Sequence, residues 1–295
     1  MSHMTDRLIW QRDGRDWPNR EASRFVQAAG LRWHVQVMGR GPVVLLLHGT
    51  GASTHSWRAL APILAGSFTV VAPDLPGHGF TDAPPGFRLS LPGMARSVGE
   101  LLRVLDLQPV LAAGHSAGAA ILVRMCLDGT LVLRYLVSLN GALLPMHGLP
   151  VGLPGEMIQS AVKLLTCVPF VPQLFASWAG EPRTVERLIR DTGSTIDAEG
   201  IALYRRLAGS PAHVGGALGM MANWNLRSLR TELPRLKTPL VLIVGTNDRT
   251  IPPAEATAVQ SLVPGASIVN LEGLGHLAHE EQPELCARLI ADLIG

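Results

Sequence analysis

The fold is decided by Gly114-His115-Ser116-Ala117-Gly118, which follows the apolar run Val110–Ala113 and opens the Ala-rich, apolar run Ala117–Leu127. A serine flanked by glycines, between a strand and a helix, predicts a tight turn that lifts the hydroxyl above a sheet at a helix N-terminus. Gly/Ser turns also arise by chance, but the flanking strand and helix favour a functional one. The sequence therefore predicts that Ser116 is a nucleophile.

A serine hydroxyl needs a base, and the base needs an orienting acid. Asp248 stands in the loop after the apolar run Leu240–Val244, and His276 follows the run Ser267–Leu271. Taken singly, these residues could be a turn-forming aspartate and an ordinary loop histidine. Their chain order of serine, acid and histidine matches a nucleophile elbow on an α/β sheet. We therefore predict a catalytic triad of Ser116, Asp248 and His276.

Acyl transfer also requires hydrogen-bond donors for the oxyanion. His48-Gly49-Thr50-Gly51 follows the continuous apolar run Val43–Leu47. This stretch could simply end the strand, but its position predicts that the backbone N–H of Thr50 is one oxyanion donor and that of Ala117 is the other. The turn from Asp74 to Gly79 is interpreted as structural, beside the site.

Metal and cofactor sites are not predicted. The spacing of His276, His279 and Glu280 is H-x-x-H-E rather than the H-E-x-x-H of a zinc site. Neither G-x-G-x-x-G nor a phosphate-binding loop is present, so no bound cofactor is expected. The 25 Lys and Arg residues nearly balance the 23 Asp and Glu residues, so no nucleic-acid partner is expected.

Strand and helix patterns alternate along the first half of the 295 residues, which predicts an α/β fold with a doubly wound, mostly parallel sheet. Between 143 and 210 the strand signal disappears, and six prolines separate helical stretches such as Met157–Leu165 and Pro182–Arg190. We therefore predict a core formed by 4–142 and 211–295, with a helical lid at 143–210. The other predicted strands are Leu31–Val37, Phe68–Ala72 and Leu133–Leu139, and the other predicted helices are Arg58–Ala65, Met94–Leu105 and Glu284–Leu293.

Location is predicted from negative signals. No apolar run reaches the roughly 18 to 20 residues of a membrane helix, and the N-terminal stretch is polar and charged, unlike a secretory signal. Cys126, Cys167 and Cys286 are widely spaced and odd in number, as expected of reduced thiols. The sequence thus predicts a cytoplasmic protein, with peripheral membrane contact left open.

Taken together, the motifs His48–Gly51, Asp74–Gly79, Gly114–Gly118, Gly245–Pro252 and Gly275-His276 resemble the α/β-hydrolase superfamily over nearly the whole chain. The resemblance implies an eight-stranded core sheet with a lid after the sixth strand. Serine at position 116 argues against the haloalkane dehalogenases and epoxide hydrolases, whose nucleophile is an aspartate.

A closer resemblance involves Asp16–Arg20 (DWPNR), Leu31–Gln36 (LRWHVQ) and His48–Trp57 (HGTGASTHSW). These stretches resemble the magnesium-chelatase accessory proteins of bacteriochlorophyll synthesis, the BchO-type family. That resemblance implies a porphyrin or chlorophyll intermediate as ligand, magnesium chelatase as a partner and a phototrophic bacterium as the source.

Apolar side chains are frequent in the predicted lid and just after it. They can line a pocket for a large apolar ligand or rest on a membrane surface, although packing on the core accounts for most of them. These residues are Leu164, Leu165, Val168, Phe170, Val171, Leu174, Phe175, Trp178, Met220, Met221 and Trp224.

Three functions fit these observations. The first is an esterase-like serine hydrolase that acts on an apolar substrate, such as a tetrapyrrole ester, through an acyl-enzyme. The second is a non-catalytic tetrapyrrole-binding accessory or chaperone protein for magnesium chelatase, with a vestigial triad. The third is a perhydrolase, C–C hydrolase or lactonase outside that pathway.

Overall fold

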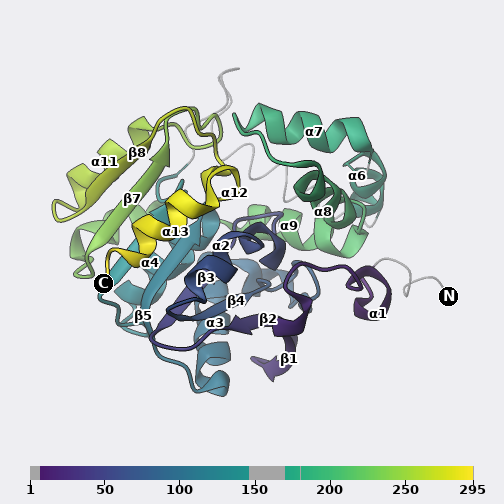
Figure 1. Ribbon diagram of the computed structural model, residues 1–295, viewed down its shortest axis with the longest axis horizontal. Coiled ribbons are helices and arrows are strands. Elements are labelled where there is room, and N and C mark those ends of the chain that lie inside the picture. The colour runs from purple at the N-terminus through teal and green to yellow at the C-terminus, as the bar shows by residue number, and fades with distance from the viewer. Residues whose placement is uncertain (1–6, 146–169, 180, 295) are drawn as a thin grey trace.

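The computed structural model describes residues 7–145, 170–179 and 181–294. Eight strands of this part of the chain form one sheet in the order β1-β2-β4-β3-β5-β6-β7-β8 (Figure 1). The neighbours from β4 to β8 are parallel, whereas β2 runs antiparallel to both β1 and β4. The predicted mostly parallel sheet is confirmed. The strands are β1 Ser23–Ala28, β2 Leu31–Met38, β3 Val43–Leu47, β4 Thr69–Pro73, β5 Pro109–His115, β6 Tyr135–Leu139, β7 Leu240–Gly245 and β8 Ser267–Leu271.

The edge strand β1 is the element that the sequence analysis did not find by pattern. It pairs only with β2, through a two-residue turn at Ala29-Gly30 in which both residues have positive φ, 53° and 70°. Such turns normally carry Asn-Gly or Asp-Gly, so an alanine at the first position conceals the hairpin signal.

Helices cover both faces of the sheet, which explains why the central strand β3 is apolar at every position. In β3, Leu45 and Leu47 face α3 and α4, whereas Val44 and Leu46 face α2, and all four are fully buried. The first face is covered by α3 Leu91–Leu105, α4 Ala117–Leu127, α10 Arg227–Glu232 and α11 Ala254–Leu262, and the second by α2 Leu60–Leu64 and α13 Pro283–Ala291.

Short elements complete the core. They are the α-helices α1 Trp10–Asp13 and α12 Ala278–Glu281, and the 3₁₀ turns η1 Arg20–Ala22, η2 Thr54–Trp57, η3 Gly86–Leu89 and η4 Leu233–Arg235.

A group of helices stands between β6 and β7 and lies together at one end of the molecule (Figure 1). The group comprises α6 Val171–Ala179, α7 Pro182–Asp191, α8 Ala198–Ala208 and α9 Pro211–Asn223. The predicted helix Pro182–Arg190 is confirmed as α7, and the predicted helix Met157–Leu165 lies outside the described residues. Since α9 packs against α6 and α8, the helical group extends past position 210. The range 143–210 for a functional lid stays a prediction.

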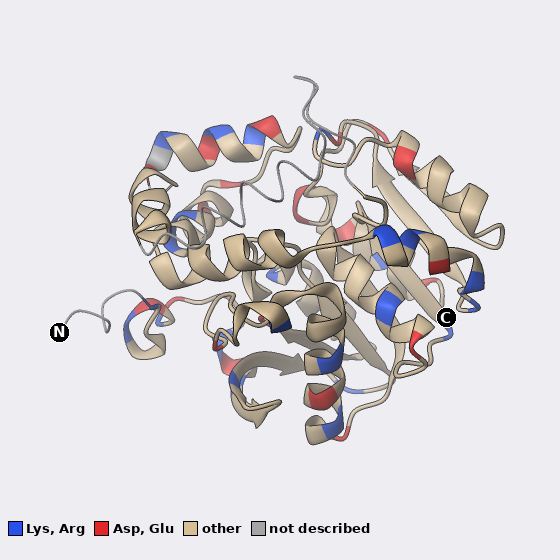
Figure 2. Ribbon diagram, turned by 180° about the vertical axis from the view of Figure 1, so that it is seen from behind, with Lys and Arg blue, Asp and Glu red and all other residues tan. Residues whose placement is uncertain are grey.

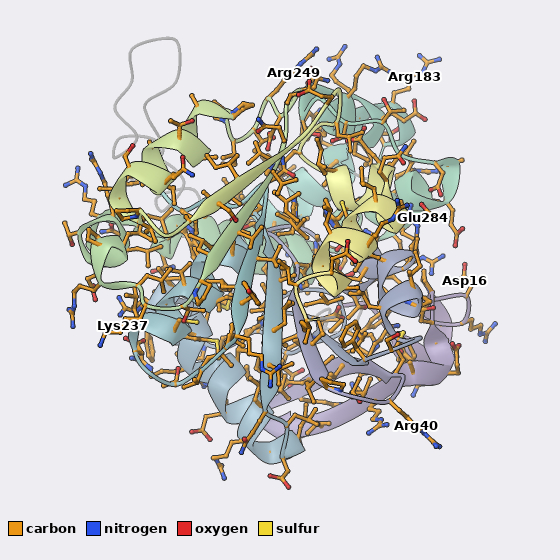
Figure 3. All side chains as sticks on the ribbon, turned by 60° about the vertical axis from the view of Figure 1, so that its left-hand side comes forward. Asp16, Arg40, Arg183, Lys237, Arg249 and Glu284 are labelled. Carbon is orange, nitrogen blue, oxygen red and sulfur yellow. The ribbon has the colours of Figure 1, made fainter. Side chains whose placement is uncertain are left out.

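Charged residues of both signs are interspersed along the outer helices, as the alternating colours on α7 show (Figure 2). The charged side chains labelled in Figure 3, among them Arg40 and Lys237, lie at the periphery. Within the described residues, no helix combines the length and apolar character needed to cross a bilayer.

Candidate active site

Ser116 lies in a tight turn between a strand and a helix. β5 ends one residue before Ser116 and α4 begins one residue after it, and Ser116 itself has φ 51° and ψ −118°, a conformation that side chains with a Cβ rarely adopt. The backbone N–H of Ser116 donates to Leu139 O at 3.1 Å, and its carbonyl accepts from Ala142 N at 3.1 Å. Gly118 is required for close packing, because a Cβ there would lie 2.2 Å from Leu47 O.

The predicted acid and base are in contact. His276 Nδ1 donates to Asp248 Oδ2 at 2.8 Å, and both side chains are buried. The same carboxylate oxygen accepts from Asn140 Nδ2 at 2.8 Å, while Oδ1 accepts the backbone N–H groups of Thr250 and Ile251 at 2.8 and 2.9 Å. Four donors therefore hold the carboxylate and fix the proton on Nδ1 of the histidine. Its Nε2 atom is left to accept a proton.

Asn140 is a site residue that the sequence analysis missed. It directly follows β6, has φ 48°, and its amide also donates to Gly275 O at 3.4 Å. Its position was a usable signal, because polar residues at the carboxyl ends of strands in such sheets gather around the ligand site.

The predicted base, His276, lies beside His115, the residue that precedes the predicted nucleophile. His115 Nε2 donates to the carbonyl of His276 at 2.9 Å, and the centroids of the two rings are 4.7 Å apart. Among the described residues, no hydrogen bond joins Ser116 Oγ to His276 Nε2. Such bonds are often long in ligand-free enzymes and shorten when substrate binds.

The loop after β3 approaches the elbow closely, since a Cβ on Gly49 would lie 2.9 Å from Ser116 Cβ. The carbonyl of Gly49 accepts from His48 Nδ1 at 2.8 Å and from Ala52 N at 3.2 Å. In a trans peptide the C=O and N–H point in opposite directions, so these bonds turn the Thr50 N–H away from the His48 ring. Within the part of the chain described, neither this N–H nor that of Ala117 donates a hydrogen bond. Both are therefore available as donors.

Replacement of His48 by alanine tests this loop. The ring also accepts from Leu75 N at 2.8 Å. His48→Ala therefore removes one of the two donors to the Gly49 carbonyl and leaves the buried N–H of Leu75 unpaired. We expect a loss of about 1–3 kcal/mol in the free energy of unfolding and a fall in kcat of about tenfold to a hundredfold with little change in KM. Chemical denaturation and steady-state kinetics measure the two effects. An unchanged kcat would show that the loop does not set an oxyanion donor.

Asp74 holds together the turn that was interpreted as structural. Its carboxylate accepts from Thr54 N, Phe80 N and His34 Nδ1 at 2.7, 2.9 and 2.8 Å and is fully buried. Burial by itself raises the pKa of Asp74, but the charge and hydrogen bonds of its partners, His34 first, outweigh it, so the pKa lies below its usual value. These contacts hold the backbone around the loop after β4.

All eight histidines in the described part of the chain are buried. Burial lowers the pKa of His213 to about 4 and that of His279 to about 3. His279 packs against the rings of Trp57 and His115, at 4.6 and 4.5 Å between centroids. Burial likewise lowers the pKa of His48, His55, His78 and His115.

These six histidines predict acid sensitivity. Their pKa values in the folded protein lie below the value of about 6.5 in an unfolded chain, so the unfolded state binds more protons as the pH falls. The stability they contribute is complete above that value and is lost as the pH drops toward the folded values. We expect the Tm to fall continuously between about pH 6.5 and about pH 5, and calorimetry across this range measures it. His213→Gln should reduce the slope, whereas a Tm independent of pH would contradict the prediction.

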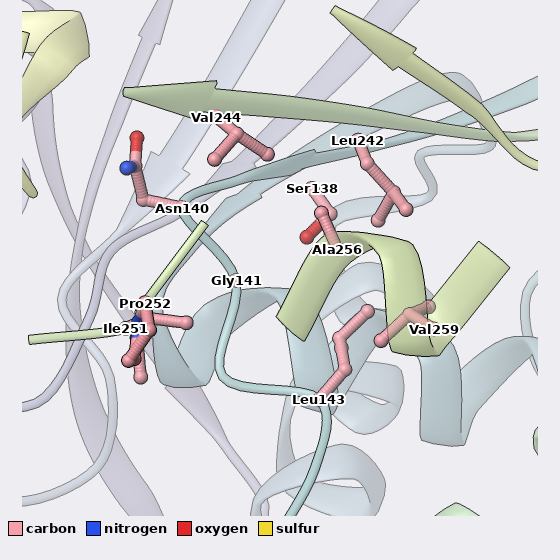
Figure 4. A pocket seen from close by; sticks show the side chains of 10 residues that line it. All are labelled: Ser138, Asn140, Gly141, Leu143, Leu242, Val244, Ile251, Pro252, Ala256 and Val259. Atoms are coloured by element: carbon pink, nitrogen blue, oxygen red, sulfur yellow. The ribbon is translucent and has the colours of Figure 1, made fainter. Parts of the chain in front are cut away.

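A small cavity lies beside residues 246–253, the loop that carries Asp248 and that we call the acid loop (Figure 4). Its volume is about 20 Å³, roughly that of one water molecule, so it is not a substrate pocket. No group of three or more His, Cys, Asp or Glu side chains in the described residues is arranged to hold a metal ion. The lining residues are Ser138, Asn140, Gly141, Leu143, Leu242, Val244, Ile251, Pro252, Ala256 and Val259.

Comparison with known proteins identifies the family. Residues 44–289 match the model of the alpha/beta hydrolase family, and this range includes Ser116, Asp248 and His276. The chain belongs to the alpha/beta hydrolase family.

Relatives within the family agree with this assignment. The chain is 37% identical, over 94% of its length and 96% of the relative's, to the magnesium-chelatase 30 kDa subunit of Rhodobacter capsulatus, which confirms the closer resemblance found in the sequence. An alpha/beta hydrolase fold protein from Burkholderia ambifaria superposes with a TM-score of 0.77 at 22% identity, covering 92% of this chain and 97% of the other. An esterase from Exiguobacterium antarcticum superposes with a TM-score of 0.73 at 20% identity, covering 92% and 99%. The two structural matches show the fold alone.

Proposed function

We propose that this α/β hydrolase is an esterase-like serine hydrolase with Ser116 as nucleophile, His276 as base and Asp248 as orienting acid. The observation that carries the proposal is the 2.8 Å bond from His276 Nδ1 to a carboxylate held by three further donors, next to a serine on a strained elbow. That arrangement fixes the tautomer that general-base catalysis requires.

The reaction follows from these positions. His276 Nε2 removes the hydroxyl proton of Ser116 as Oγ attacks the ester carbonyl, and the Thr50 and Ala117 N–H groups stabilise the oxyanion. The imidazolium, stabilised by Asp248, protonates the leaving alcohol as the ester C–O bond breaks, which leaves an acyl-enzyme. Water, deprotonated by the same imidazole, then attacks the acyl carbon. The serine regains its proton and the carboxylic acid is released.

An apolar substrate is supported by a methionine that contacts the loop after β3 and by exposed apolar side chains at α6. The buried Met220 of α9 reaches this loop, with its sulfur 3.5 Å from Thr50 Oγ1. On α6 and just before it, Phe170, Leu174 and Trp178 are each more than half exposed, at 70%, 69% and 53%. We propose that residues 143–210 act as a lid over a wide apolar pocket.

The proposed biological setting is bacteriochlorophyll synthesis in a cytoplasm, in association with magnesium chelation. It is supported by the relative named as a magnesium-chelatase subunit, which matches the chain over nearly its full length. The corresponding substrate is an ester of a porphyrin or chlorophyll intermediate, magnesium chelatase is the partner, and the exposed side chains of α6 would make any peripheral membrane contact.

The second candidate function is a non-catalytic tetrapyrrole-binding accessory protein for magnesium chelatase. It is favoured by that relative and by the absence, within the described residues, of a hydrogen bond between Ser116 Oγ and His276. A perhydrolase or C–C hydrolase would use the same site, and the side chains lining the substrate pocket would distinguish it.

One paired experiment separates the first two candidates. The purified protein is treated with a fluorophosphonate probe, and the labelled peptide is identified by mass spectrometry. In parallel, magnesium protoporphyrin monomethyl ester is titrated while its Soret band is recorded. Labelling at Ser116 supports the hydrolase. A saturable Soret shift without labelling supports the accessory protein.

A further inference from the structure

The connection between α7 and α8 begins with Thr192-Gly193-Ser194-Thr195, which we call the 192–195 segment. It lies against the acid loop, residues 246–253, and against residues 272–277, which carry His276 and which we call the base loop. The carbonyl of Thr192 accepts the backbone N–H of Arg249 at 3.1 Å and that of His276 at 3.3 Å. One carbonyl of the helical group thus binds the base itself and the residue that follows the acid.

Two further bonds hold the residues that flank the acid and the base. Gly193 O accepts from Asn247 Nδ2 at 2.7 Å, immediately before Asp248. Ser194 Oγ accepts the backbone N–H of Leu277 at 2.8 Å, immediately after His276, and Ser194 is 2% exposed. Because the bond between Ser194 and Leu277 is buried, losing its acceptor leaves the Leu277 N–H unpaired.

A carboxylate and an apolar cluster join the same surfaces. Glu281 accepts Gly275 N at 2.8 Å through Oε1 and Thr195 N at 3.1 Å through Oε2, so it bridges the base loop and the segment. The side chain of Leu277 packs in one buried cluster with Val185, Ile189 and Ile196 of the helical group. The base loop is therefore held to the helical group by both hydrogen bonds and apolar contacts.

The fit between the segment and the acid loop leaves no room for a side chain at position 193. Gly193 has φ 86°, and a Cβ there would lie 2.0 Å from the backbone oxygen of Asn247. A substitution must therefore move either the segment or the acid loop.

We propose that the 192–195 segment is a positioning element for the acid and base, so that the helical group between β6 and β7 sets the geometry of Asp248 and His276. The catalytic roles of Asp248 and His276 rest on the proposed function, but the positioning of their side chains does not. It follows that displacement of α7 and α8 as a unit would disturb the pair, and that opening motions compatible with catalysis leave this segment in place.

Three variants of the full chain test the proposal. Gly193→Ala forces the segment away from the acid loop, Ser194→Ala removes the acceptor of the Leu277 N–H, and Glu281→Gln weakens the bridge with the smallest change of shape. The matched control is Gly129→Ala, which has a similar positive φ of 70° but nothing within 4 Å of the added Cβ. Thermal unfolding identifies any variant that does not fold, in which case Glu281→Gln carries the test.

The first readout is the downfield proton resonance of the His276 Nδ1–H bonded to Asp248, assigned by its loss in His276→Gln. The second is the rate of fluorophosphonate labelling at Ser116. We expect the resonance to shift or broaden and labelling to slow by about tenfold to a hundredfold in Gly193→Ala and Ser194→Ala, with Gly129→Ala like wild type. An unchanged resonance in folded Gly193→Ala and Ser194→Ala overturns the proposal, as does an unchanged resonance in Glu281→Gln where those two variants do not fold. If the wild type is not labelled at all, the hydrolase proposal fails while the resonance still decides the positioning role.

Discussion

The Ser116→Ala variant is expected to lose nearly all ester turnover, by about 10⁴- to 10⁶-fold in kcat, because no other group can form the acyl-enzyme. Alanine and serine both carry a Cβ and face a similar cost at φ 51°, so the fold should keep its stability. The loss can then be assigned to the missing hydroxyl. Steady-state hydrolysis of an apolar ester and fluorophosphonate labelling measure it.

The control for this variant is Ser261→Ala on α11. Ser261 is exposed, and its hydroxyl donates to Thr257 O within its own helix, so neither turnover nor labelling should change. If Ser116→Ala hydrolyses esters as fast as wild type, Ser116 is not the nucleophile. If the wild type hydrolyses no ester and Ser116→Ala still binds the tetrapyrrole, the accessory-protein function is favoured.

The residues that could be predicted from the sequence are those whose signal is local. Ser116 stands in a turn whose glycines and flanking runs are contiguous, and Asp248 and His276 each follow an apolar strand in the chain order of this fold. The structure brings the last two together at 2.8 Å. The catalytic roles themselves remain predictions until they are measured.

The residues that could not be predicted act through tertiary contacts. Asn140, which follows β6, binds Asp248 although the two residues are 108 positions apart in the sequence, and the 192–195 segment reaches the two loops from the helical group. Nothing in Thr192-Gly193-Ser194-Thr195 differs from an ordinary helix-to-helix connection. Its importance comes from the partners that the fold places against it.

The edge strand shows the same limit in the fold. The hairpin of β1 and β2 turns through Ala29-Gly30, where alanine replaces the residue type that marks such turns. The family resemblance supplied the eighth strand, whereas local pattern did not.

Asp248→Asn is expected to lower kcat by about 10⁴-fold while the protein still folds. Each oxygen of Asp248 accepts two hydrogen bonds, Oδ2 from His276 and Asn140, and Oδ1 from the backbone of Thr250 and Ile251. An asparagine must place its NH₂ group at one of these positions, where two donors would face it. If the NH₂ group faces His276, the imidazole is driven to the tautomer with a proton on Nε2, which cannot accept the serine proton. If it faces the backbone, the N–H groups of Thr250 and Ile251 lose their acceptor and the loop is displaced.

The two orientations differ in what they do to the base, and the downfield His276 resonance distinguishes them. Its disappearance indicates the tautomer change, whereas its retention with lowered stability indicates a displaced loop. Asp292→Asn, at the exposed end of α13, is the charge-matched control and should leave activity and the resonance unchanged. Near-normal turnover in Asp248→Asn would mean that Asp248 is not the acid. Asn140 binds the same carboxylate from the end of the neighbouring strand β6. If Asp248 is not the acid, Asn140→Ala should therefore also leave kcat unchanged. If Asp248 is the acid, Asn140→Ala removes one of the four hydrogen-bond donors that hold the Asp248 carboxylate, and kcat should fall by about tenfold or less.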